Sequence, residues 1–174
     1  MSEQMDLKKY IRDIPDFPKA GIIFKDITTL LKDKLAFKFA IDKLAQEYKA
    51  KRIDSVAAIE ARGFIFGGAL AHKLGVGFIP VRKRGKLPWK TLSQSYELEY
   101  GTDSLEVHED AINPQDNVLI VDDLLATGGT AAAVAELFAK MQGKIAGIAF
   151  VIELEFLKGR EKLRGYPVFS LIKY

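Results

Sequence analysis

The stretch Val118-Leu-Ile-Val-Asp122-Asp123-Leu-Leu-Ala-Thr-Gly128-Gly129-Thr130 decides the fold of this chain. Its first four residues are apolar and branched, so they leave no polar face and predict a strand that is buried on both sides. From Ala131 the spacing becomes helical, because apolar residues recur at i, i+3, i+4 and i+7: Val134, Leu137, Phe138 and Met141. Gly143 is placed to stop this helix. The loop between strand and helix therefore joins a carboxyl end to a helix amino terminus.

This junction loop is suited to an anion. Backbone N–H groups at a helix amino terminus lack partners within the helix, and the helix dipole favours negative charge there. Gly128 and Gly129 let the backbone approach a phosphate closely, and the hydroxyl groups of Thr127 and Thr130 can add donors. The loop therefore predicts a phosphate site.

Asp122 and Asp123 precede the loop and cannot bind the same phosphate, because like charges repel. They suit the hydroxyl groups of a sugar attached to that phosphate, so one segment would hold a phosphate and a ribose diol. An ordinary strand–turn–helix is the alternative, but it would leave two carboxylates at a buried edge without partners. The dinucleotide fingerprint needs a third glycine and a P-loop needs Gly-Lys-Ser/Thr, so neither motif fits.

Length and composition describe one globular domain. The 174 residues, 48% of them hydrophobic and 28% charged, suffice for a sizeable core. No apolar run approaches the ~20 residues of a membrane helix and no signal-peptide pattern opens the chain, so we expect a cytoplasmic location and no membrane contact. Zero cysteines exclude disulfides, cysteine-based zinc sites and a thiol nucleophile. A net charge of +3 does not argue for nucleic acid, although positive charge could gather locally on an anionic substrate.

Strands alternate with helices along most of the chain. The apolar pattern predicts helices over about 35–50, 65–74 (ending at Gly75) and from 131, and strands over 55–59, 76–81, 118–122 and 146–152. This order is typical of an α/β fold with a mostly parallel sheet covered by helices on both faces. Ligands in such folds bind beyond the carboxyl ends of the strands. We therefore expect residues 60–64, 82–86 and 122–130 to surround one cleft.

Two segments break the alternation. Tyr96, Leu98 and Tyr100 alternate with glutamates, a turn follows at 101–104, and a second alternating run covers 105–108, which predicts an antiparallel hairpin. A polar loop over about 83–95 precedes it, and a loop of that length is more often a lid than an idle connection. Residues 1–34 form a separate irregular segment.

Basic residues follow two of the predicted strands. Arg62 comes directly after one, and Arg82, Lys83, Arg84 and Lys86 come at the end of another. Pyrophosphate is a suitable target, because it offers several charged oxygens and arginine can contact them in pairs. A solvated charge run is the alternative for Arg84. Nucleic acid is a weaker reading, since the cluster is short and lacks interleaved aromatic residues.

The two histidines give no metal signal. His72 lies in a predicted helix and His108 in the predicted hairpin, and neither has a companion at metal-ligand spacing. We expect both at the surface.

Together with the stretch from Asp122 to Thr130, six further segments resemble, in the family's order, the type I phosphoribosyltransferases and within them the adenine-specific branch: 15–18, 21–26, 61–67, 82–88, 96–101 and 157–162. The similarity covers nearly the whole chain. It implies a type I phosphoribosyltransferase fold as a single domain over 1–174, with a hood over the base at 1–34 and a flexible lid loop and hairpin at 83–108.

The resemblance also implies an activity. The 5-phosphoribosyl group of 5-phosphoribosyl 1-pyrophosphate would be transferred to adenine, giving AMP and pyrophosphate in purine salvage. Mg²⁺ would bind mainly through pyrophosphate oxygens rather than through protein side chains. The resemblance further implies a homodimer.

The family's residue roles fall on matching positions. Glu99 would be the catalytic acid/base for the purine proton, although the hairpin pattern alone cannot choose it over Glu97, which shares its face. The binding positions are, for the 5-phosphate, Ala126, Thr127, Gly128, Gly129 and Thr130; for ribose, Asp122 and Asp123; for pyrophosphate, Arg62, Arg82, Lys83 and Lys86; and for adenine, Ile23, Phe24 and Lys25. The family often has arginine at the Lys25 position, so a backbone contact there is the safer expectation.

Two alternative functions stay open at this point. One is a phosphoribosyltransferase for a 6-oxopurine, against which the hood motif and Leu98-Glu-Tyr-Gly101 argue. The other is a non-catalytic regulator that senses phosphoribosyl pyrophosphate, since fold alone does not determine function. Such a regulator needs an effector module, and the residues before the first clear helix look like a hood instead.

Overall fold

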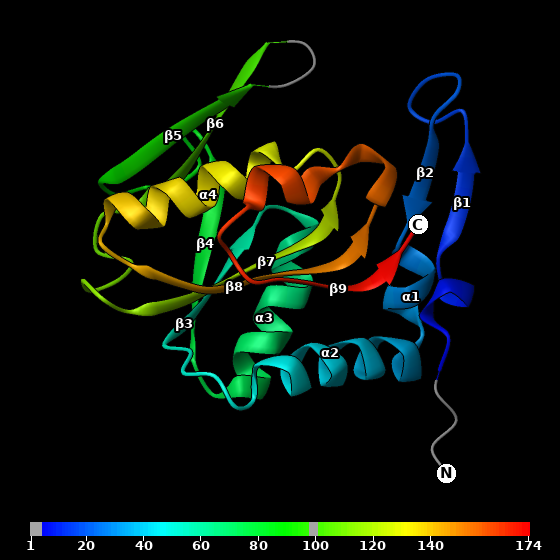
Figure 1. Cartoon of the computed structure of the whole chain (residues 1–174), viewed down its shortest axis with the longest axis horizontal. Coiled ribbons are helices and arrows are strands. Elements are labelled where there is room, and N and C mark those ends of the chain that lie inside the picture. The colour runs from blue at the N-terminus through cyan, green and yellow to red at the C-terminus, as the bar shows by residue number, and fades with distance from the viewer. Residues whose placement is uncertain (1–4, 98–100) are drawn as a thin grey trace.

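A seven-stranded sheet with the order β5-β6-β4-β3-β7-β8-β9 forms the centre of the molecule (Figure 1). We describe it from a computed structural model, which covers residues 5–97 and 101–174. The strands are β3 Ser55–Ile59, β4 Gly77–Lys83, β5 Thr91–Glu97, β6 Thr102–His108, β7 Asn117–Leu125, β8 Lys144–Glu153 and β9 Val168–Lys173. Strands β4, β3, β7, β8 and β9 are parallel to one another, and β5 and β6 pair antiparallel at one edge. The expected α/β fold with a mostly parallel sheet is confirmed.

Helices cover both faces of this sheet. Helices α2 Lys34–Tyr48 and α3 Arg62–Leu74 pack on one face and α4 Gly129–Lys140 on the other. Within β3, Val56 and Ala58 belong to the core under α2 and α3, whereas Ala57 and Ile59 belong to the core under α4. Burial of both faces is the reason that this strand is apolar at successive positions. Among the described residues, no helix is long and apolar enough to cross a membrane.

The amino-terminal segment is more regular than the sequence pattern predicts. It contains a 3-10 turn η1 Leu7–Tyr10, strands β1 Arg12–Pro15 and β2 Ile23–Asp26, and the short helix α1 Thr28–Lys32. Strands β1 and β2 form an antiparallel hairpin that stands beside the carboxyl terminus (Figure 1). The prediction of an irregular segment was wrong because Pro15 ends its strand and Pro18 lies in the turn, so neither proline removes a ladder hydrogen bond.

The predicted polar loop over 83–95 is shorter than expected. Strand β4 runs through Lys83 and β5 begins at Thr91, so only residues 84–90 connect them. The start of β5 escapes the sequence pattern because it is held by backbone pairing to β6 and buries few side chains. The turn predicted at 101–104 also shifts, since Thr102 to Ser104 belong to β6 and Glu97 pairs with Thr102. The predicted hairpin positions Leu98 and Tyr100 lie outside the described residues.

Glycines near two helix ends act differently. Gly75 adopts a left-handed conformation with φ of +71° and ends α3, as predicted. Helix α4 ends at Lys140, before Gly143, so the prediction that Gly143 stops it was wrong. A Cβ at Gly143 would lie 2.5 Å from Ile112 Cδ1, so glycine there leaves room for the Ile112 side chain. Helix α3 begins three residues earlier than predicted, which places Arg62 in its first turn.

Candidate active site

The carboxyl ends of β3, β4 and β7 surround a cleft of about 370 Å³. It is lined by Ile59, Glu60, Ala61, Arg62, Lys83, Tyr96, Leu105, Asp122, Asp123 and Thr130. All three segments that the sequence places at strand ends, 60–64, 82–86 and 122–130, contribute to it. The expectation of one cleft built by these segments is therefore confirmed, and β6 and the end of β5 add a further wall.

The predicted phosphate loop lies between β7 and α4. Gly128 has a φ of +79° and is the N-cap of α4, and no side chain caps the helix. The first N–H groups of α4 therefore remain available to an anion, and no acidic residue in the first turn opposes one. Thr130 borders both the cleft and a smaller cavity of about 70 Å³, which Ala126, Thr127 and Gly128 also line. Gly129 is the first residue of the helix and lies near the end of β5.

Asp122 and Asp123 lie within β7 rather than in the loop, and each has its own surroundings. Arg62 Nε lies 2.7 Å from Asp123 Oδ2, and the Asp123 side chain is only 8% exposed. Asp122 Oδ1 accepts a hydrogen bond of 2.9 Å from the N–H of Asp123. Burial, and then the charge of Asp123, raises the pKa of Asp122 well above its ordinary value. A Cβ at Gly63 would lie 2.8 Å from Asp122 Oδ1, so glycine there makes room for this carboxylate.

Arg62 joins the acidic pair to the amino-terminal hairpin. Besides its ion pair with Asp123, its guanidinium lies 5.2 Å from the centre of the Phe24 ring. Phe24 also meets Phe17 edge to face, with ring centres 5.2 Å apart. The structure thus brings a predicted adenine residue, a predicted pyrophosphate residue and a predicted ribose residue together through one side chain.

The other two residues predicted to contact adenine differ from Phe24. The Ile23 side chain is 56% exposed at the edge of the hairpin. Lys25 Nζ lies 2.7 Å from Asp13 Oδ1 and 3.8 Å from the centre of the Tyr174 ring, and its side chain is largely buried. The Lys25 side chain therefore fastens the hairpin to the carboxyl terminus, and its backbone is what remains for a ligand.

The basic group at the end of β4 is held by two carboxylates. Arg82 Nη2 donates to Glu60 Oε2 at 3.1 Å, and its Nη1 donates to the Lys86 carbonyl at 3.1 Å. Glu60 Oε1 accepts from the N–H of Lys83, whose Nζ lies 3.0 Å from Asp103 Oδ2. The hydrogen bond to Asp103, together with its charge, raises the pKa of Lys83. Lys86 is exposed, and the N–H of Arg84 donates to the carbonyl of Ser104 at 3.2 Å.

Glu99, the predicted acid/base, lies outside the described residues. The last described residue of β5, Glu97, brings its carbonyl oxygen to 3.7 Å from a Cβ built at Gly129. The described end of β5 therefore lies near the phosphate loop.

Three residues of the site had no role in the sequence prediction. Glu60 organises the basic group, and it could have been found by the strand-end rule that selects Asp122. Tyr96 lies against Thr130 in the cleft, and burial raises its pKa. Gly159 packs on the phosphate loop from a distant segment. The motif 157–162 contains it, but no local pattern indicates what it touches.

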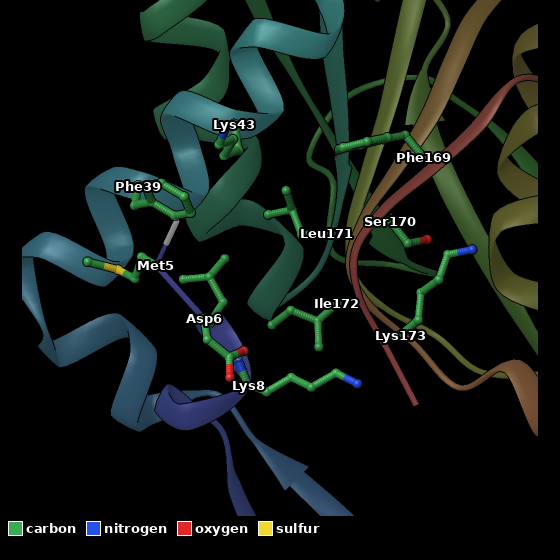
Figure 2. Close-up of a pocket in the computed structure, with 11 residues that line it drawn as sticks. Met5, Asp6, Lys8, Phe39, Lys43, Phe169, Ser170, Leu171, Ile172 and Lys173 are labelled. Atoms are coloured by element: carbon green, nitrogen blue, oxygen red, sulfur yellow. The ribbon is translucent and has the colours of Figure 1, made fainter. Parts of the chain in front are cut away.

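A larger hollow of about 600 Å³ lies elsewhere, between the amino-terminal segment, α2 and β9. Figure 2 shows Asp6 and Lys8 on the first of these elements, Phe39 and Lys43 on the second, and Phe169 to Lys173 on the third. None of its lining residues comes from the loops that follow β3, β4 or β7. Volume alone therefore does not identify the site. Within 5–97 and 101–174, no group of three or more His, Asp or Glu side chains could hold a metal ion.

Comparisons with known proteins show similarity over nearly the whole chain. The family model of the phosphoribosyl transferase domain matches residues 28–172. The chain is 63% identical to the adenine phosphoribosyltransferase of Halothermothrix orenii, over 97% of this chain and 99% of that one. It is similar to the crystal structure of the adenine phosphoribosyltransferase from Thermoanaerobacter pseudethanolicus, with a TM-score of 0.94, 58% identity, and coverage of 97% and 98%. The Saccharomyces cerevisiae enzyme, solved with an imino-altritol bisphosphate and adenine, has a TM-score of 0.90 and 44% identity over 95% of this chain and 96% of that one.

Proposed function

This chain belongs to the adenine phosphoribosyltransferases of the phosphoribosyl transferase domain family, and on that premise we propose which residues carry each part of the reaction. The enzyme transfers the 5-phosphoribosyl group from 5-phosphoribosyl 1-pyrophosphate to adenine, and it releases AMP and pyrophosphate. One observation carries the assignment of residues: an acidic pair and a glycine loop at a helix amino terminus border the same cleft as a basic strand end.

The 5-phosphate binds to the loop from Ala126 to Thr130 in this proposal. The uncapped amino terminus of α4 and the left-handed Gly128 support it, because they leave backbone donors free beside the cleft. Asp122 and Asp123 accept hydrogen bonds from the two ribose hydroxyls. Both residues lie in β7 shortly before the loop. This short separation suits a ribose diol and the 5-phosphate of the same sugar.

Pyrophosphate binds to Arg62, Arg82, Lys83 and Lys86. The first three are paired with Asp123, Glu60 and Asp103, respectively, so binding requires that their cations turn from carboxylates to pyrophosphate oxygens. A group with several negative charges competes well for such cations, and arginine can contact two oxygens at once. Glu60 and Asp103 keep the basic residues in place until that exchange.

Adenine binds beneath the hood, where Phe24 stacks on the heterocycle and the backbone of Ile23 to Lys25 reads its edge. The proximity of Phe24 to Arg62 supports this placement, because Arg62 lines the cleft. The Lys25 side chain takes no part, since Asp13 and Tyr174 hold it.

Glu99 manages the proton of the reaction. As the bond from the anomeric carbon to pyrophosphate breaks, the leaving group takes the electron pair and an oxocarbenium-like centre forms. A purine nitrogen attacks that centre, and a carboxylate accepts the proton that the base loses. The described end of β5 lies near the phosphate loop, and closure of the predicted lid, residues 83–108, over the cleft would exclude water.

Mg²⁺ enters with the substrate in this proposal. Of the described residues, Glu60, Asp122 and Asp123 bring carboxylates to the cleft, but they do not form a group that could hold a metal ion, and Arg82 and Arg62 already pair with Glu60 and Asp123. Such a donor set fits an ion that would be held mainly by pyrophosphate oxygens and water. When bound, the ion neutralises charge that develops on the departing pyrophosphate.

The assembly proposed is a homodimer. Ile65 on α3 and Phe78 on β4 are 43% and 39% exposed, and both elements carry a basic residue of the site at an end. Apolar side chains of this size on neighbouring elements support an interface there. Sedimentation velocity of the chain and of Phe78→Glu tests it, because the substitution should yield a monomer.

A cytoplasmic location without nucleic-acid partners completes the proposal, supported by the absence of cysteine and the small net charge.

A steady-state assay tests the proposed function. It uses 5-phosphoribosyl 1-pyrophosphate and Mg²⁺ and offers adenine, hypoxanthine, guanine and xanthine separately. We expect AMP from adenine and no nucleotide from the oxopurines. Turnover of an oxopurine instead would reject the base assignment while the phosphate and ribose assignments stand. Binding of 5-phosphoribosyl 1-pyrophosphate without turnover of any base would favour the regulator.

A further inference from the structure

The phosphate loop rests against a second loop from far along the chain. This second segment contains two 3-10 turns, η2 Glu155–Leu157 and η3 Gly159–Leu163. A Cβ at Gly159 would overlap the carbonyl oxygen of Ala126 and lie 3.1 Å from the nitrogen of Gly128. A Cβ at Gly128 would overlap the carbonyl oxygen of Gly159 and lie 3.0 Å from its carbon. The two backbones therefore touch directly, and only glycine fits on either side.

A bend in the chain brings the backbone of Gly159 against the phosphate loop. Lys158, which joins η2 to η3, has a φ of +54°, a left-handed conformation that non-glycine residues adopt at a cost. The N–H of Leu154 donates to the carbonyl of Leu125 at 2.9 Å, so the segment starts where β7 ends. Leu163 closes it by packing into the core under α4. Both ends of the segment are thus attached to the elements that flank the phosphate loop.

One ion pair holds the middle of the segment. Arg160 donates from Nε to Glu153 Oε1 at 2.6 Å and from Nη2 to Glu153 Oε2 at 2.8 Å. Its Nη1 donates to the carbonyl of Val168 at 3.0 Å, so Arg160 joins the end of β8 to the start of β9. The Glu153 side chain is only 4% exposed, and loss of one partner of a buried pair leaves an uncompensated charge. Arg160 therefore anchors the residue next to Gly159 in a definite position.

A loop that presents several free N–H groups to one point needs such support. The aligned N–H dipoles repel one another, so the loop tends to relax unless packing opposes it. Within the phosphate loop itself, no side chain caps the helix. The contact with Gly159 is the packing that opposes relaxation.

We infer that Gly159 and Arg160 are positioning residues for the 5-phosphate site: Gly159 holds the phosphate loop in its binding conformation, and the Arg160–Glu153 ion pair holds Gly159. Neither residue touches the substrate. The inference rests on the proposed role of Ala126 to Thr130. Its consequence is selective, since affinity for 5-phosphoribosyl 1-pyrophosphate depends on these residues and affinity for adenine does not.

The test compares Arg160→Lys and Gly159→Ala with a control near the start of β7, the end of that strand that lies away from the phosphate loop. Arg160→Lys keeps the charge but loses the paired hydrogen bonds, and we expect KM for 5-phosphoribosyl 1-pyrophosphate to rise about tenfold, with KM for adenine unchanged. Gly159→Ala pushes directly on the loop, and we expect a loss of about 100-fold in kcat/KM for that substrate. The control is Asp54→Ala, which removes two 2.7 Å hydrogen bonds to Asn117 at the start of β7. It should lower the melting temperature and leave both KM values unchanged.

Calorimetric binding of 5-phosphoribosyl 1-pyrophosphate to each variant separates this inference from the proposed function. Weaker binding by both variants supports positioning even if the wild-type chain fails to convert adenine, in which case only the proposed reaction is rejected. Variants that melt earlier but bind this substrate as the wild type does would overturn the inference and leave a structural role. If Gly159→Ala does not fold, Glu153→Gln replaces it and should resemble Arg160→Lys. A wild-type chain that does not bind the substrate at all rejects both proposals.

Discussion

The proposed phosphate and ribose half of the cleft comes from one continuous stretch, β7 and the start of α4. The proposed base and pyrophosphate half is instead assembled from the β1–β2 hairpin, the start of α3, the end of β4, and strands β5 and β6. In the first half, Val118 to Val121 are fully buried and the loop rests on Gly159. In the second half, Phe17 and Ile23 are exposed, and ion pairs such as Lys25–Asp13 and Lys83–Asp103 make many of the contacts.

This difference concerns how strongly each half is held. A fully buried apolar side chain contributes about 1.5–3 kcal/mol, while an exposed ion pair contributes about 0–1 kcal/mol. The first half is therefore expected to be rigid, and the second half can open at low cost. A rigid phosphate and ribose site with a movable cover suits a reaction that must admit both a charged sugar and a flat base.

The largest effect should come from the chemistry that the movable half carries. We expect Glu99→Gln to lower kcat by about 10²–10⁴-fold, because the amide cannot take the proton from the purine. Both KM values should change little, since ground-state contacts are kept. Glu97→Gln is the matched control on the same face of the hairpin and should keep kcat. An equal loss of kcat in both variants would contradict the choice of Glu99.

The next largest effect should come from a glycine with a left-handed backbone conformation, which each half of the cleft contains. Gly128 and Gly85 have φ of +79° and +78°, but a Cβ at Gly128 would overlap Gly159 while one at Gly85 meets nothing within 4 Å. We expect Gly128→Ala to lower kcat/KM for 5-phosphoribosyl 1-pyrophosphate by about 100-fold. Gly85→Ala should show only the strain of a left-handed alanine, about 1 kcal/mol of stability. Steady-state kinetics and thermal melting of both variants measure this, and equal kinetic losses would remove the contrast between the halves.

A smaller effect should distinguish the two substrates. Phe24→Ala removes the ring that stacks on the base, and we expect KM for adenine to rise about tenfold. KM for 5-phosphoribosyl 1-pyrophosphate should stay unchanged, because β2 lies apart from the phosphate loop. Phe24→Tyr keeps a ring and is the control that should bind adenine normally. A rise in both KM values would mean that Arg62, which lies against Phe24, transmits the change to the ribose site.

The smallest effect is one of stability and depends on pH. The folded protein binds a proton at Asp122 more tightly than the unfolded chain does, since its pKa is raised above 3.8. The stability that this proton contributes is therefore fully present below the ordinary pKa of an aspartate. It is lost as pH rises through the raised pKa of Asp122. Asp122→Asn lacks this loss, so at neutral pH we expect it to be more stable by about 1 kcal/mol, or about 2–4 °C in Tm.

Melting curves of Asp122→Asn and the wild type across pH test this sign. The difference in Tm should grow as pH rises above the ordinary pKa of a carboxyl group and then level off. The variant should also bind 5-phosphoribosyl 1-pyrophosphate more weakly, because an amide is a poorer partner for the ribose hydroxyls. A variant that is less stable than the wild type at neutral pH would show that Asp122 is ionised without strain.

Parts of the fold could be predicted because their signals are local. Strand β3 and the start of β7 are apolar runs between polar residues, and α3 ends at a glycine that adopts the expected left-handed conformation. The hood hairpin and the first residues of β5 could not be predicted in this way. Their stability comes from backbone pairing with strands that lie elsewhere in the sequence, and their side chains are too mixed to form a periodic pattern.

The sequence by itself determined the α/β class, the acidic pair before a glycine loop, and the set of strand ends that surround the cleft. Periodicity and the rule that parallel strands end at one edge suffice for these features. Only the tertiary structure decided that Arg62 pairs with Asp123, that Glu60 holds Arg82, and that Gly159 supports the phosphate loop. These contacts join residues that are far apart in the chain. Which residues meet depends on how the folded backbone places them and on how far each side chain reaches, and neither can be read from a local pattern.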